Sequence, residues 1–199
     1  MSNVTTVPDR PVAAAPDRQP AADAALLVYR GFKFGAAFFG WLIAISMAVL
    51  LSAAVSAVAL LTAEILDYNR SDAESAPAAA GLTASVMGIV VIAVAFYSGG
   101  YVAGRLARFD GARNGFGVWM VAVLVAVLTA GAGALLNSQY DWLGDVQRPD
   151  IALSTETLAT GGVIAAVALI VVTLLSAIVG GKSGQRYHEK IDRLIASEE

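Results

Sequence analysis

Four long runs of apolar residues, separated by short polar segments, dominate the pattern of this chain. They cover residues 34–61, 81–104, 115–136 and 158–181, and none of them contains Asp, Glu, Lys, Arg or His. About 20 apolar residues in a helix cross the roughly 30 Å hydrocarbon core of a bilayer, so each run is long enough. Because a helix in a soluble protein is seldom apolar on every face, the runs predict four transmembrane helices.

The composition agrees with this interpretation. Of the 199 residues, 57% are hydrophobic and only 15% are charged, which is too few charges to cover the surface of a soluble domain of this size. The chain has no cysteine, which excludes disulfides, thiolate catalysis and cysteine-based metal sites. We therefore expect an all-α integral membrane protein that uses the lipid bilayer as its solvent.

Lysine and arginine are distributed unevenly between the polar segments. The N-terminal tail, the segment between the second and third runs, and the C-terminal tail together hold eleven of the thirteen cations, and the other two segments hold Arg70 and Arg148. Cytoplasmic segments carry the excess of such cations. Both termini are therefore expected to be cytoplasmic. Arg is much commoner than Lys and Ala is very abundant, a bias typical of GC-rich bacterial genomes, so the expected localisation is a multi-pass protein of a bacterial plasma (inner) membrane.

The two tails differ in character. Residues 1–24 contain four prolines among Ala, Asp and Arg, which predicts a disordered tail. Residues 24–33 are compatible with a short interfacial helix, and residues 185–199 are expected to form an amphipathic tail.

The runs also resemble two copies of one helical hairpin. A shift of 78 residues places Trp41 on Trp119, and a shift of 81 places Gly99 and Gly100 on Gly180 and Gly181. This register predicts one repeat over residues 25–108 and a second over residues 109–184. Because each copy contains an even number of spans, the repeats would have the same orientation. Two unrelated hairpins that obey the same interface rules are the alternative.

Small residues recur at four-residue spacing along the spans, where close backbone approach drives helix association in lipid. The predicted helix-packing residues are Ala44, Ala48, Ser52, Ser56, Ala122, Ala126, Ala130, Ala134, Gly99, Gly100, Gly180 and Gly181. Two roles remain open for these stripes: packing inside a four-helix bundle, or contact with another subunit.

Five cations at the ends of the spans are candidates for contact with lipid or a protein partner: Arg105, Arg108, Arg113, Lys182 and Arg186. Such cations attract anionic headgroups. The simpler alternative is that they only set the topology.

The sequence offers little for catalysis or cofactor binding. Residues 180–184 (GGKSG) match only part of a phosphate-binding loop, because position 176 is Ser176 where the pattern needs glycine. His188 is the single histidine and has no partner ligands in its segment. Intramembrane catalysis needs ionisable groups inside the bundle, and the runs have none. We therefore expect no enzyme activity, no catalytic residues, no cofactor, no metal and no nucleic-acid partner.

The segments SGGYVAGRLARFDGAR (98–113) and GGKSGQRYH (180–188) resemble uncharacterised four-span integral membrane proteins of actinobacteria. The resemblance covers roughly residues 30–195. It implies a bacterial four-span protein and assigns no activity.

The function expected from these features is that of a structural or accessory subunit, which forms a homo-oligomer or docks to a larger membrane complex. The alternative is an oligomeric channel or permease component.

Overall fold

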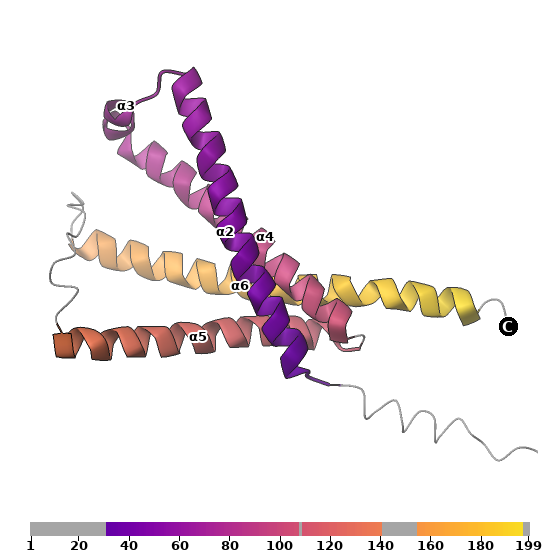
Figure 1. Ribbon diagram of the computed structural model, residues 1–199. Coiled ribbons are helices and arrows are strands. Elements are labelled where there is room, and N and C mark those ends of the chain that lie inside the picture. Colours follow the sequence, from indigo (N-terminus) through magenta and orange to yellow (C-terminus); the bar gives the residue numbers. More distant parts are fainter. Residues whose placement is uncertain (1–30, 108, 141–154, 197–199) are drawn as a thin grey trace, which may run out of the picture. The chain divides into compact units, whose positions relative to one another are not determined.

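Five α-helices account for the regular structure in the computed structural model, which describes residues 31–107, 109–140 and 155–196 (Figure 1). They are α2 (Phe34–Ile65), α3 (Arg70–Ser75), α4 (Pro77–Ala107), α5 (Gly111–Tyr140) and α6 (Thr155–Ala196). The predicted disordered tail, residue Arg108 and most of the segment between the third and fourth runs lie outside the described residues.

Four of these helices match the four apolar runs. The stretches that are long and apolar enough to cross a membrane are Phe34–Ile65, Pro77–Ala107, Gly111–Gln139 and Gly162–Arg186. The predicted all-α architecture with four membrane-length helices is confirmed for the described part of the chain. The helices α2, α4 and α5 extend three or four residues beyond their apolar runs, and α6 continues well past the end of its run, because polar residues at a membrane surface can continue a helix that the apolar core has already established.

The helix ends have recognisable local causes. Pro77 is the first residue of α4, where its missing N–H is harmless and its fixed φ suits the helix. Asp67, just after α2, and Asp110, just before α5, have φ values of 51° and 55°. Asp is one of the few non-glycine residues that adopt this left-handed conformation readily, so both positions suit tight reversals of the chain.

The structure adds three details to the sequence expectation. The six-residue α3 was not predicted; its N-cap is Asn69, whose side chain accepts the Ser71 and Asp72 N–H groups while the Asp72 side chain accepts the Asn69 N–H. The helix α6 continues without a break through residue 184 to Ala196, and the division into repeats and an amphipathic tail from residue 185 stays a prediction. Of the proposed interfacial helix, residues 31–33 are described and are not helical.

From Gly31 onward the chain forms one compact unit. Its central helix is α4, which packs against α2, α5 and α6, and α5 also contacts α2 and α6. Glycine and alanine form most of the interface between these helices, so neighbouring backbones approach each other closely.

Buried residues gather in one half of the spans. This half, called the basic end below, is the part of the spans nearest Lys33, Arg105, Arg113 and Lys182. The buried positions are residues 36, 37, 40 and 44 of α2; 91, 95, 99, 100, 103, 104 and 107 of α4; 111, 114, 115, 117, 118 and 121 of α5; and 173, 177, 180, 181 and 184 of α6. The opposite halves expose large apolar side chains, among them Leu60, Leu82, Leu128 and Val163.

Candidate functional site

Glycine pairs hold α4 and α6 together at the basic end. A Cβ atom added to Gly100 would lie well inside 3.0 Å of the Ala177 carbonyl oxygen, and one added to Gly104 would meet Gly181 in the same way. In the other direction, a Cβ on Gly180 would meet the carbonyl oxygen of Tyr97. Since real Cβ atoms essentially never approach so closely, these positions admit only glycine without movement of a backbone.

A second close approach joins α2 to α4 and α5. A Cβ on Gly40 would lie 2.6 Å from both the Gly99 carbonyl oxygen and Cγ2 of Val118. Next to this contact, Ala44, Ala103 and Val118 form a buried cluster, and Trp41 and Phe96 pack against it.

Asn114 is the polar centre of the basic end and is completely buried. Its Oδ1 accepts the Lys33 N–H at 2.9 Å, and its Nδ2 donates to the Asp110 carbonyl oxygen at 3.1 Å. The Asp110 carboxylate in turn accepts the Gly31 N–H at 2.9 Å. These bonds fix the segment before α2 to the start of α5, which lies about 80 residues further along the chain.

A second polar contact, which is partly buried, lies deeper in the spans. The indole N–H of Trp119 donates to Oγ1 of Thr173 at 3.2 Å, and Thr173 donates to the Leu169 carbonyl oxygen at 2.7 Å. Trp119 therefore links α5 to α6.

A small pocket of about 330 Å³ opens between the start of α5 and the basic end of α6. The residues that line it are Asp110, Ala112, Arg113, Lys182, Gln185 and Arg186. Three of the five predicted lipid or partner cations thus meet around one space.

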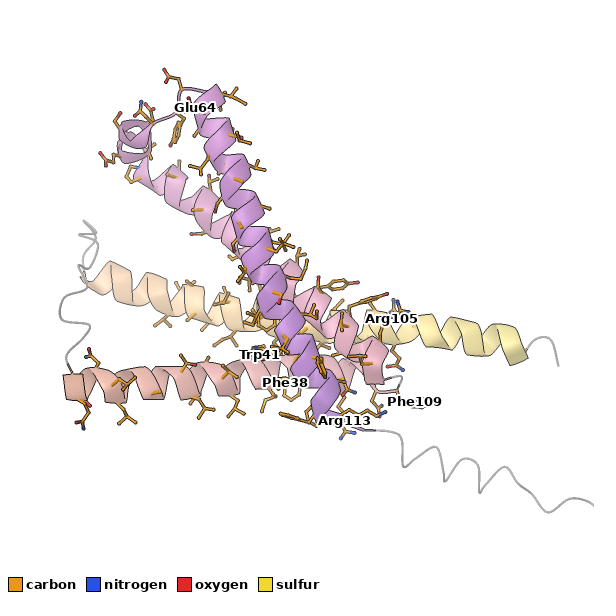
Figure 2. The ribbon with its side chains drawn as sticks, viewed as in Figure 1. Phe38, Trp41, Glu64, Arg105, Phe109 and Arg113 are labelled. Carbon is orange, nitrogen blue, oxygen red and sulfur yellow. The ribbon has the colours of Figure 1, made fainter. Side chains whose placement is uncertain are left out.

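The other two predicted cations are placed differently. Arg105 lies over the ring of Tyr101, with its guanidinium carbon 5.9 Å from the ring centroid and Nη1 3.4 Å from the hydroxyl oxygen. Arg108 lies outside the described residues. Figure 2 shows Arg105, Phe109 and Arg113 at the basic end, with Glu64 at the far end of α2.

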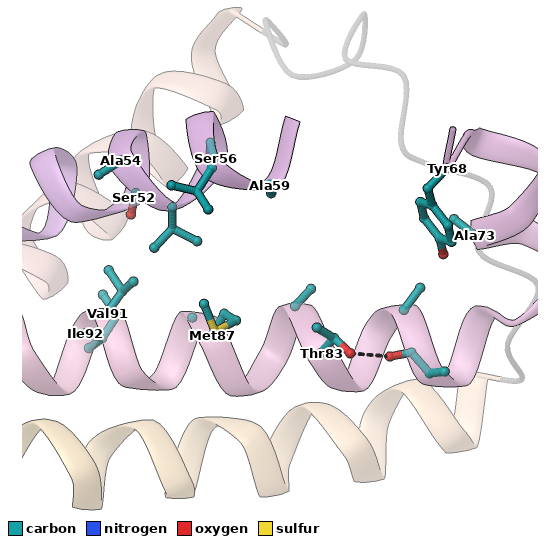
Figure 3. A pocket seen from close by; sticks show the side chains of 16 residues that line it. Ser52, Ala54, Ser56, Ala59, Tyr68, Ala73, Thr83, Met87, Val91 and Ile92 are labelled. Atoms are coloured by element: carbon teal, nitrogen blue, oxygen red, sulfur yellow. Dashed lines mark hydrogen bonds between the residues drawn. The ribbon is translucent and has the colours of Figure 1, made fainter. Parts of the chain in front are cut away.

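A larger, apolar groove lies between α2 and α4 near α3, with a volume of about 980 Å³ (Figure 3). Its lining includes Ser52 and Ser56 from α2, and Met87 and Val91 from α4. The groove contains no charged side chain among its lining residues. It provides an apolar surface for lipid or for another apolar segment.

The predicted packing residues divide by depth along each stripe. Gly99, Gly100, Gly180 and Gly181 are buried at helix contacts. On α2, Ala44 is buried, Ala48 is half-buried, and Ser52 and Ser56 are exposed in the groove. On α5, Ala122 is half-buried and Ala126, Ala130 and Ala134 are exposed. The exposed members lie at the surface of the part of the chain that the structure describes.

Sequence reasoning missed Asn114, Asp110 and Gln185 as positioning residues. Gln185 Oε1 accepts the Gly111 N–H at 2.6 Å, which ties α6 to the start of α5. The available signal was the position of Asn114, an amide one residue before an uncharged span. Such a group must find partners if it is buried.

Comparison with known proteins gives no identification, because no protein-family model, curated protein or solved structure matches this chain. Among the described side chains, no three His, Cys, Asp or Glu residues lie close enough to share a metal ion. The site can therefore be interpreted only from its own chemistry, which combines a cation-lined pocket with glycine-packed helices.

Proposed function

We propose that this protein is a structural or accessory subunit of a bacterial plasma membrane, which associates with copies of itself or with a larger membrane complex. The observation that carries the proposal is the exposed stripe of Ala126, Ala130 and Ala134 on α5. Small residues at this spacing let a second helix approach closely in lipid. Since the stripe is not used inside the chain, a helix of another subunit is the partner that suits it.

The burial pattern supports the same proposal. Internal packing is concentrated at the basic end, whereas the opposite halves of the spans expose apolar side chains. Lipid chains can pack around large side chains such as Leu128, but they make few van der Waals contacts with a shallow alanine stripe. Association through that stripe would add the van der Waals contacts that the single chain lacks.

The proposed orientation places the basic end at the cytoplasmic surface and both termini in the cytoplasm. It rests on the distribution of Lys and Arg between the polar segments. We propose further that the chain consists of two parallel hairpin repeats, supported by the match of Trp41 with Trp119 and of the paired glycines in the second and fourth spans.

Cysteine cross-linking in native membranes tests the subunit role directly, because the natural chain contains no cysteine. Ala130→Cys places a thiol on the exposed stripe, and Leu128→Cys places one at nearly the same depth on the opposite side of α5. We expect oxidation to give a dimer or a larger adduct for Ala130→Cys and little product for Leu128→Cys.

Equal or absent cross-linking at both positions would contradict the proposal. Thiols at Ala126 and Ala134 extend the test along the same face. The competing function, an oligomeric channel or permease component, predicts selective solute flux through liposomes that contain the purified protein. Robust flux would overturn the accessory role.

A further inference from the structure

The pocket at the basic end brings together three cations from two helices. Arg113 comes from the first turn of α5, and Lys182 and Arg186 come from one face of α6, four residues apart. The only carboxylate among the lining residues is that of Asp110, which already accepts the Gly31 N–H. The lining therefore has a formal excess of two positive charges.

Backbone packing, and not chance proximity of long side chains, brings these cations together. A Cβ on Gly111 would collide with the Gly181 carbonyl oxygen, and one on Gly115 would collide with Ala177. The Gly111 N–H also donates to Gln185 Oε1 at 2.6 Å. Because Lys182 directly follows Gly181 and Gln185 directly precedes Arg186, this contact fixes both α6 cations beside the start of α5.

The electrostatics of the pocket favour an anion. Three of the six lining residues are cations and one is a carboxylate. The first turn of α5 adds its positive helix dipole at Ala112, which lines the same space. An anion with several oxygens could accept hydrogen bonds from two guanidinium groups and the ammonium group at once.

We propose that this pocket binds a phosphate group, carried either by the headgroup of an anionic lipid or by a small soluble phosphate ester. The phosphate oxygens would accept from Arg113 and Arg186, with Lys182 as a further point charge. The position of the pocket suits either source, since Lys182 and Arg113 lie next to the ends of apolar runs, at the depth of headgroups. This inference does not depend on self-association.

Binding measurements on the full-length protein in phosphatidylcholine nanodiscs test the proposal. One arm titrates glycerol 3-phosphate and inorganic phosphate by calorimetry. The other arm adds short-chain phosphatidylglycerol and records thermal stability against added phosphatidylcholine. The variants are Arg113→Gln, Lys182→Gln and Arg186→Gln, singly and combined, and Arg105→Gln is the control because Arg105 lies on Tyr101, outside the pocket.

Each of these cations makes charge-assisted hydrogen bonds, so removing one should lower the affinity about tenfold. Removing all three should lower it more than about 100-fold. Arg105→Gln should change the affinity by less than about twofold, because it removes a cation from the same end of the protein without altering the pocket. Binding of the soluble phosphates with this pattern assigns the pocket to a soluble ester, and binding of phosphatidylglycerol alone assigns it to a lipid headgroup. The proposal is overturned if neither probe binds, or if Arg105→Gln weakens binding as much as Arg186→Gln.

Discussion

Gly100→Ala is the substitution that tests most directly whether glycine packing holds α4 to α6. The added Cβ would lie 2.9 Å from the carbonyl carbon of Ala177 and closer still to its oxygen, whereas ordinary contact begins at 3.4 Å. The obstacle is backbone, so no side chain can rotate away. Because the oxygen is the closest obstacle, the two helices must then move apart by about 1 Å, a gap that forfeits about half of the dispersion attraction between facing atoms.

The matched control is Gly88→Ala in the same helix, where an added Cβ would meet nothing within 4 Å. In both variants alanine replaces glycine inside α4 and gains about 1 kcal/mol of helix propensity. That gain cancels in the comparison, which leaves the packing term alone. Overpacking of this kind costs about 1–3 kcal/mol, so we expect Gly100→Ala to be less stable than Gly88→Ala by that amount.

Reversible unfolding in mixed detergent micelles, followed by circular dichroism, measures this difference. A Gly100→Ala variant that fails to fold while Gly88→Ala folds gives the same answer qualitatively. Equal stability of the two variants, within about 0.5 kcal/mol, would refute the glycine-packed interface between α4 and α6.

Two further predictions concern buried polar contacts. Asn114→Ala removes the acceptor of the Lys33 N–H. We expect the free energy of unfolding to fall by about 1–3 kcal/mol in the same assay, and proteolysis near Lys33 to become faster. Unchanged stability and proteolysis would contradict the role given to Asn114. Trp119→Phe removes the hydrogen bond to Thr173 while keeping an aromatic ring. Since Thr173→Val removes the same bond, we expect Thr173→Val to cost about 1 kcal/mol less in the Trp119→Phe background than in the wild-type chain, and full additivity would show that the bond contributes nothing.

The sequence was sufficient to predict the four spans, because an uncharged apolar run of more than 20 residues is seldom anything other than a transmembrane helix. It could not predict which members of a small-residue stripe are buried. Ala44 and Ser52 share one face of α2, yet Ala44 is buried against α4 and Ser52 lies exposed in the groove. Four-residue spacing gives the direction in which a side chain points, but it contains no information on where two helices diverge.

The same reasoning explains the outcome for the five cations. Their positions along the chain placed them together at the ends of spans, but only the folded structure separates Arg105, which lies on Tyr101, from the three that line the pocket. Long-range contacts such as Lys33 with Asn114 could not be derived either, because a backbone N–H has no preference for one distant amide until the helices are packed.

The division of the spans into a tightly packed basic end and an exposed opposite half has a consequence for how the protein could work. At the basic end, Gly181 touches the backbone of Gly111, and its neighbour Lys182 lines the pocket. A ligand held by Lys182, Arg186 and Arg113 would therefore reinforce the contact that already joins α5 and α6. The exposed alanines lie on the same continuous helix α5. Phosphate binding at one end and subunit contact at the other would thus act on a single element, α5.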